Sequence, residues 1–311
     1  MFLDAAPYRS PMADVSTRPV TRVIEATHTL EGAGFGVYRP FPTPALDHLD
    51  PFLLLDELEP RVYAPGERKG APDHPHRGFE TVSYILAGET EHRDSTGNGG
   101  IIRAGGVQWM TAGDGIIHSE MPGPTMVREG GLSHGFQLWV NLPRDLKRTP
   151  PRYQSLEPGG LTEVTGDGWT ARIIAGAVLG ATGPARTHTP INYVHLTLTP
   201  GAEVTLDIPT DHNIGVHAFA SHGSVGDPAV PLARSQFAIL SPGEGDLVIR
   251  GPGPSPEEAE PMEVLVLSGR PLNEPIARYG PFVMNTREEL IEAIEDYNAG
   301  RFGTIPPMEL D

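Results

Sequence analysis

The chain has 311 residues, a formal net charge of −17 and no cysteine. This length suits two domains, the acidity argues against direct binding to nucleic acid, and the missing thiols exclude disulfides and cysteine nucleophiles. No apolar stretch approaches the roughly 18 residues of a membrane span, and the first residues lack the pattern of a signal peptide. We therefore expect a cytoplasmic protein that makes no contact with membranes.

Short apolar runs punctuated by turns indicate an all-β chain. Glycine and proline number 37 and 33, and they separate these runs along the whole sequence, as in proteins with many short strands. After a flexible arm at 1–17, strand patterns fill 18–142 and then 162–285. The segment 143–161 is polar and rich in proline, so it is predicted to be a linker. The sequence therefore predicts two β-barrels followed by a C-terminal segment at 286–311.

One helix is predicted within the C-terminal segment. Thr286 is followed three residues later by Glu289, which is the spacing of a capping box. Leu290 and Ile294 repeat at helical spacing, and Gly300 can end the helix. We expect a short helix that packs against a barrel.

Two short motifs in the first half predict a metal site. His74 and His76 are two residues apart, and so are His118 and Glu120. Side chains at i and i+2 of a β-strand point to the same face. Two neighbouring strands can thus deliver three imidazoles and one carboxylate, a ligand set suited to a divalent transition metal. An isolated His-x-His pair is weak evidence, but the second motif makes the combination a strong signal.

The second half carries neither motif. Its histidines stand at other spacings, so we expect the second barrel to be free of metal. They are His188, His195, His212, His217 and His222.

Around the two motifs, long stretches of the chain resemble the pirin family of bicupins, and the resemblance extends from about residue 20 to about residue 302. The stretches that carry it are 49–57, 73–84, 108–113, 118–122, 134–141 and 279–285. The resemblance implies two antiparallel jelly-roll barrels, with one metal ion, in the first barrel only.

The fourth ligand has two candidates. Many cupins place a glutamate shortly after the His-x-His pair, and Glu80 fits that spacing. Glu120 fits the pirin pattern and is preferred, which leaves Glu80 to orient an imidazole from outside the ligand set. With no thiolate in the set, Fe, Mn, Co, Ni, Cu and Zn all remain suitable. The resemblance favours Fe(II).

The resemblance also implies an activity. Pirin-like proteins are linked to quercetin 2,3-dioxygenase activity, the ring cleavage of a flavonol by O₂ with release of carbon monoxide. Glu120 would accept the proton of the substrate hydroxyl, and Asp56 and Gln137 match positions near the substrate pocket. The alternative is a metal-dependent regulatory protein that binds a transcription factor or a metabolic enzyme.

Overall fold

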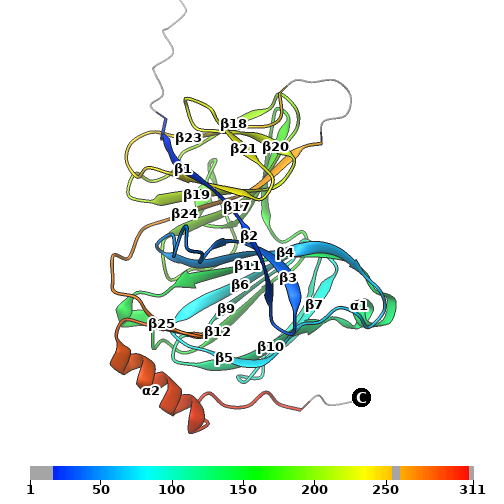
Figure 1. The fold of residues 1–311 in the computed structure, drawn as a ribbon, viewed down its shortest axis with the longest axis vertical. Helices are drawn as coiled ribbons and strands as arrows, with labels where there is room; N and C mark the ends of the chain where they lie inside the picture. Colours follow the sequence, from blue (N-terminus) through cyan, green and yellow to red (C-terminus); the bar gives the residue numbers. More distant parts are fainter. Residues whose placement is uncertain (1–16, 254–259, 308–311) are drawn as a thin grey trace, which may run out of the picture.

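The protein consists of two β-barrels, one above the other in Figure 1. The computed structural model describes residues 17–253 and 260–307. Each barrel combines a seven-stranded and a four-stranded sheet, and the pairings between the named strands are antiparallel. The predicted all-β architecture of two barrels with a short C-terminal helix is confirmed.

The first barrel carries the two predicted metal motifs. Its seven-stranded sheet runs in the order β12 (Arg152–Leu156), β9 (Val107–Thr111), β6 (Phe79–Ala87), β11 (Gly131–Asn141), β4 (Phe52–Tyr63), β3 (Phe35–Phe41) and β2 (Thr27–Glu31). Its four-stranded sheet runs β5 (Ala71–His76), β10 (Ile116–Pro122), β7 (Glu89–Asp94) and β8 (Gly99–Arg103). A short helix, α1 (Pro124–Glu129), precedes β11, and the 3₁₀ turn η1 (Arg144–Leu146) follows it.

The second barrel repeats this plan. Its seven-stranded sheet runs β1 (Val20–Glu25), β22 (Gln236–Leu240), β19 (Asn213–Ala220), β24 (Met262–Gly269), β17 (Ile191–Leu198), β14 (Trp169–Ala175) and β13 (Thr162–Gly166). Its four-stranded sheet runs β18 (Glu203–Leu206), β23 (Leu247–Arg250), β20 (His222–Val225) and β21 (Val230–Ala233). Two small ladders complete the strands, β15 (Ala177–Val178) with β16 (Ala181–Thr182) and β25 (Ala277–Tyr279) with β26 (Phe282–Met284).

Two strands lie elsewhere than the sequence suggested. Strand β1 was expected in the first barrel but pairs with β22 of the second, because a strand's partner is set by tertiary packing that its own pattern does not encode. Strand β12 lies inside the expected linker at 143–161 and pairs with β9. The prolines on both sides of this strand conceal it in the sequence. The arm predicted at 1–17 falls, except for Thr17, outside the described residues, and the division of the chain at 143–161 stays a prediction.

An apolar layer joins the two barrels. The seven-stranded sheets face each other across one buried cluster that includes Val82 and Leu138 from the first barrel. In strand β24, Leu265 and Leu267 enter this shared layer, while the alternating Val264 and Val266 enter the interior of the second barrel. This part of the strand is buried on both faces, which explains the apolar run from Val264 to Leu267.

The interiors of the two barrels differ. In the second barrel, aliphatic side chains from both sheets form one continuous core, with Ile173, Leu196 and Val216 fully buried in it. In the first barrel, by contrast, the sheets enclose a cavity of about 560 Å³.

The C-terminal segment returns to the first barrel. The ladder β25–β26 leads into helix α2 (Arg287–Asn298), which lies at the end of the molecule remote from the second barrel (Figure 1). The predicted capping box is present: the Thr286 hydroxyl accepts the Glu289 N–H, and the Glu289 carboxylate accepts the Thr286 N–H. On the helix, Asp296 accepts a 2.7 Å hydrogen bond from Arg77, next to the first metal motif.

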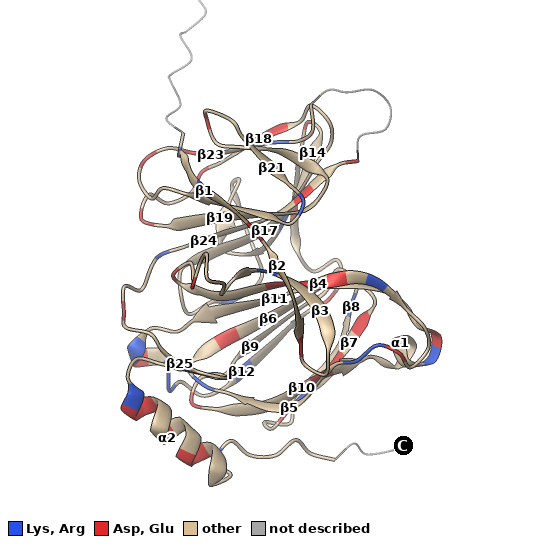
Figure 2. Cartoon of the chain, viewed as in Figure 1, with Lys and Arg blue, Asp and Glu red and all other residues tan. Residues whose placement is uncertain are grey.

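Lys and Arg are spread over both barrels and the loops between strands (Figure 2). In the ranges that the structure describes, no helix is long and apolar enough to cross a membrane.

Candidate metal centre

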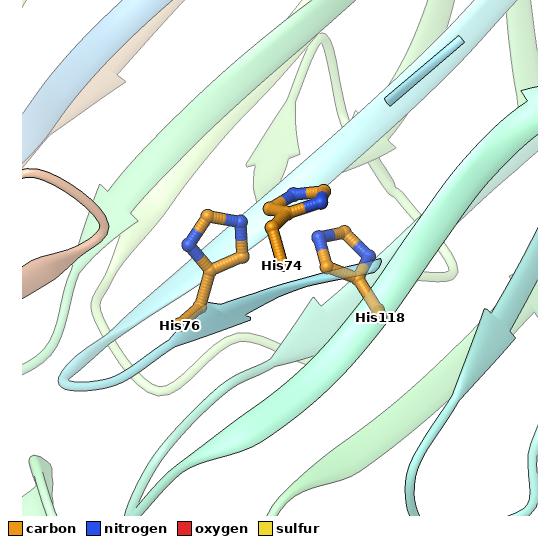
Figure 3. Close-up of side chains that lie close together, drawn as sticks. All are labelled: His74, His76 and His118. Carbon is orange, nitrogen blue, oxygen red and sulfur yellow. The ribbon is translucent and has the colours of Figure 1, made fainter. Parts of the chain in front are cut away.

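Strands β5 and β10 bring the three predicted histidines together. The two strands are antiparallel neighbours in which His118 lies directly opposite His74, and Ile116 opposite His76. The ligand atoms offered by the three rings all lie within 4.8 Å of one another. Figure 3 shows the rings rising from the two strands toward a common point. Among the residues described, this is the one group of three or more potential ligands that is so compact.

Hydrogen bonds turn one nitrogen of each ring away from this point. His74 Nδ1 lies 2.6 Å from the Pro72 carbonyl oxygen, and His76 Nδ1 lies 3.3 Å from that of Pro281. A carbonyl accepts only from N–H, so both rings carry their proton on Nδ1. His118 Nδ1 points to another imidazole, that of His92, at 3.4 Å. In each ring Nε2 is therefore the atom left for an ion, which is the usual arrangement around a metal.

Two further observations fit a metal ion. His118 Nε2 is buried and has no hydrogen-bond partner among the described residues, a costly state that an ion would relieve. Burial, reinforced by the neighbouring imidazoles, lowers the pKa of His76 and His118 well below the ordinary value. Both rings are thus neutral at physiological pH, as metal ligands must be.

The fourth predicted ligand, Glu120, is held beside the cluster. One carboxylate oxygen accepts a short hydrogen bond from the Ser83 hydroxyl, and the other lies 3.2 Å from Gln137 Nε2. Ser83 Oγ is also 2.6 Å from Gln137 Oε1, so the three side chains form one network. Glu120 is not a member of the compact group of ligand atoms, and its role as a ligand stays a prediction.

Glu80 lies on the wrong face of its strand for either role considered in the sequence. In β6 it shares a face with Val82 and Tyr84, whose side chains belong to the layer between the barrels. Its carboxylate accepts a 2.6 Å hydrogen bond from Thr111 and lies 3.6 Å from the guanidinium of Arg152. The prediction that Glu80 orients an imidazole or replaces Glu120 is therefore wrong, because strand parity turns it away from the cluster.

The cluster opens into the 560 Å³ cavity of the first barrel, a volume typical of small-molecule sites. Both predicted pocket residues, Asp56 and Gln137, line it. Burial raises the pKa of Asp56 to about 6, against the opposing effect of Arg39. Arg39 holds that carboxylate through two hydrogen bonds of 2.7 and 2.6 Å.

Two aromatic side chains pack beside the cluster. Trp139 and Phe79 both pack against the ring of His76, with centroids 5.2 and 5.1 Å away. The guanidinium of Arg278, from the C-terminal ladder, lies over Trp139 at 5.2 Å, within the range of a cation–π contact. Trp139 therefore brings one aromatic ring to the cavity wall next to the candidate metal position.

Several residues of this site were not predicted from the sequence. Alternation in β6 could have placed Ser83 on the inner face, opposite Val82 and Tyr84. Alternation in β11 could likewise have paired Trp139 with Gln137 on the cavity face. The motif His92-x-Asp94 was a third signal of the same kind as the two that were used. The contribution of Pro281 has no local signal, because it comes from the far end of the chain.

Comparison with known proteins agrees with this architecture. A family model described as Pirin matches residues 34–140, and one described as Pirin C-terminal cupin domain matches residues 193–303. A pirin-like protein from Solanum lycopersicum is 40% identical over 296 residues, which cover 94% of this chain and 96% of the relative. Pirin from Homo sapiens is 38% identical over 293 residues, 93% of this chain and 95% of the relative.

A solved structure is similar over nearly the whole chain. The crystal structure of a quercetin 2,3-dioxygenase from Acinetobacter baumannii shares 40% sequence identity with this chain at a TM-score of 0.86. The match covers 94% of this chain and all of that one. With both barrels matched by the family models, the chain belongs to the pirin family, whose members have the bicupin fold.

Proposed function

We propose that this protein is a metal-dependent dioxygenase that opens the ring of quercetin, or of a related flavonol, with O₂ and release of carbon monoxide. The observation that carries the proposal is a compact group of three imidazoles at the edge of a cavity that Trp139 helps to line. The similar Acinetobacter protein is named quercetin 2,3-dioxygenase, which supports the choice of substrate. The cytoplasmic location expected from the sequence stays a prediction.

His74, His76 and His118 would hold the ion, with Glu120 as the fourth ligand, and Fe(II) is the metal we propose. Mn, Co, Ni, Cu and Zn suit the same donors. A divalent ion bound there would lower the pKa of a coordinated substrate hydroxyl.

The side chains have distinct tasks in this proposal. Glu120 takes the proton of the substrate hydroxyl onto a carboxylate oxygen, while Ser83 and Gln137 keep that carboxylate in place. Trp139 lines the cavity beside His76, where an aromatic substrate can pack against it. Asp56, fixed by Arg39, presents a charged group at the cavity wall, directly across from Gln137 in the neighbouring strand.

The test is reconstitution of metal-free protein with Fe²⁺, Mn²⁺, Co²⁺, Ni²⁺, Cu²⁺ and Zn²⁺ in turn. We expect quercetin loss, O₂ consumption and carbon monoxide release above the rate with free metal for at least one ion. His118→Ala should lose the bound metal, whereas His222→Ala, at an exposed histidine of the second barrel, should keep it.

The Glu120→Gln variant tests metal binding and catalysis separately. The amide oxygen can still ligate an ion, but it cannot take a proton, so turnover should fall by roughly 100-fold or more. If no ion gives turnover above the free-metal rate, the dioxygenase proposal fails and the regulatory alternative becomes the better explanation.

A further inference from the structure

A buried cluster of three polar side chains lies behind His118. It consists of His92 and Asp94 from β7 and Gln108 from β9, and each is at most 1% exposed. Strand β7 pairs with β10, and His118 lies opposite Asp94 in that pairing. These residues belong neither to the candidate ligands nor to the cavity wall, so burial of three polar groups here calls for a physical reason.

Within this cluster, the donor and the acceptor of each hydrogen bond can be assigned. His92 Nε2 lies 3.2 Å from Asp94 Oδ2, and His92 Nδ1 lies 2.7 Å from Gln108 Nε2. The amide nitrogen of Gln108 can only donate, so His92 Nδ1 is an acceptor and its proton is on Nε2, facing the carboxylate. The remaining contact of His92 Nδ1 is His118 Nδ1 at 3.4 Å.

Asp94 is itself fixed. Its other oxygen, Oδ1, accepts from the backbone N–H of Thr96 and Asn98 at 2.9 and 3.1 Å, and from the Thr96 hydroxyl at 2.6 Å. Burial works against its charge, but the bonds from His92 and Thr96 outweigh it and lower the pKa of Asp94. Tyr153 stacks on the His92 ring at 5.0 Å and 15°, so the plane of that ring is also set.

This arrangement determines the tautomer of His118. Because His92 Nδ1 presents a lone pair, His118 must carry its own proton on Nδ1, and its lone pair is then on the buried Nε2 that has no partner in the described structure. His74 and His76 obtain the same tautomer from backbone carbonyls. For His118 the acceptor that sets this tautomer is the side chain of His92, which can be replaced by mutation.

We propose that His92, held by Asp94, is a positioning residue that fixes the tautomer and orientation of His118 for metal binding. This inference rests on the metal site of the proposed function. Partners of this kind typically change metal affinity by about 10- to 100-fold.

The test compares two substitutions of His92. His92→Phe keeps a ring to stack on Tyr153 but removes the acceptor, whereas His92→Asn places an amide oxygen close to the position of Nδ1. Co²⁺ affinity of the metal-free proteins is measured by competition with a chelator. We expect the dissociation constant to rise about 10- to 100-fold in His92→Phe and to stay within about fivefold of the parent protein in His92→Asn.

A second readout needs no metal. In the ¹H–¹⁵N spectrum of the metal-free protein, His118 should show the Nδ1–H tautomer in the parent and in His92→Asn, and a substantial Nε2–H fraction in His92→Phe. If His92→Phe does not fold, Asp94→Asn takes its place, since it frees His92 to carry its proton on Nδ1. This variant should also weaken Co²⁺ binding and shift the His118 tautomer.

The outcomes are distinguishable. If the parent binds Co²⁺ and His92→Phe binds it equally well, the role of His92 is refuted while the metal site stands. If His92→Asn weakens binding as much as His92→Phe, restoring the acceptor does not restore binding, and the inference is again wrong. If the parent itself binds no Co²⁺, the metal site and the inference fail together.

Discussion

The ring of His76 donates its Nδ1 proton to the carbonyl oxygen of Pro281, 3.3 Å away in space and 205 positions along the chain. The same C-terminal ladder hydrogen-bonds to the residue after His76, because Val283 N–H donates to the Arg77 carbonyl at 3.1 Å. The ammonium group of the buried Lys147 ties both segments together through the carbonyls of Gly78 and Val283, at 2.8 and 3.0 Å. The strand that supplies two candidate ligands is therefore held by the end of the chain.

Gly78→Ala should break this contact. Gly78 has φ +90°, and a Cβ there would lie 2.0 Å from the Val283 carbonyl oxygen, so the ladder must move away. Gly97→Ala is the matched control, with φ +87° and no atom within 4 Å of the added Cβ. The control should cost only the backbone strain, about 1–2 kcal/mol. We expect a clearly larger loss of stability, and weaker metal binding, in Gly78→Ala. Equal denaturant midpoints for the two variants would show that the contact with Val283 is unimportant.

Asp296→Ala should destabilise the protein by about 3 kcal/mol, because it leaves the guanidinium of Arg77 buried without its main partner. The side chain of Arg77 is only 3% exposed. On the same helix, Glu292 pairs with Arg148 at the surface, and Glu292→Ala should cost less than about 1 kcal/mol. Denaturant unfolding of the two variants gives the comparison. Similar losses would mean that the buried pair adds nothing beyond a surface one.

Ser83→Ala should lower turnover by roughly 10-fold while metal content stays near that of the parent, since it removes a hydrogen bond to Glu120 but no candidate ligand. Ser155→Ala, at an exposed serine of β12, is the control and should leave turnover unchanged. Metal content by elemental analysis and steady-state quercetin kinetics are the measurements. Loss of metal in Ser83→Ala would instead assign Ser83 to metal retention.

His195 should make the protein sensitive to acid. Burial, aided by Arg172 and His134, lowers the pKa of His195 from 6.5 to about 3. Below pH 6.5 His195 therefore becomes protonated in the unfolded chain but stays neutral in the folded protein until about pH 3. The contribution of His195 to the free energy of unfolding is therefore fully present above pH 6.5, and it falls by about 1.4 kcal/mol for each pH unit down to about pH 3.

His195→Gln keeps a polar partner for Tyr84, which lies 2.9 Å from His195 Nδ1, but it does not titrate. Unfolding of the metal-free protein at pH 7, 5.5 and 4 should thus show a shallower decline in this variant than in the parent. His222→Gln, at an exposed position, should follow the parent. Parallel pH profiles for all three proteins would rule out His195 as the titrating group.

Local sequence pattern was enough to predict that the three histidines lie together. The two-residue periodicity of a strand was enough to bring His74, His76 and His118 together, since each pair needs only a strand and one antiparallel neighbour. The capping box at Thr286 was also predicted, because helix ends are determined by residues within one turn. The same periodicity would have excluded Glu80, which has the parity of Val82 and Tyr84 rather than that of Ser83.

The sequence does not show which residues far apart along the chain contact one another. The residues of β1 show a strand pattern, but that pattern does not state that the partner is β22 rather than a strand of the first barrel. Likewise, nothing near Pro281 indicates that its carbonyl meets His76. Such contacts depend on how the two barrels pack, and so they lie beyond reasoning from local sequence.

The long separation between His76 and Pro281 also has a consequence for biosynthesis. A ribosome that adds about 5–20 residues per second exposes Pro281 roughly 10–30 s after His118. During that interval the nascent chain can present the three imidazoles, but the carbonyl that orients His76 has not yet been made. If an ion binds as proposed, we therefore expect it to bind after the ladder β25–β26 has docked against His76.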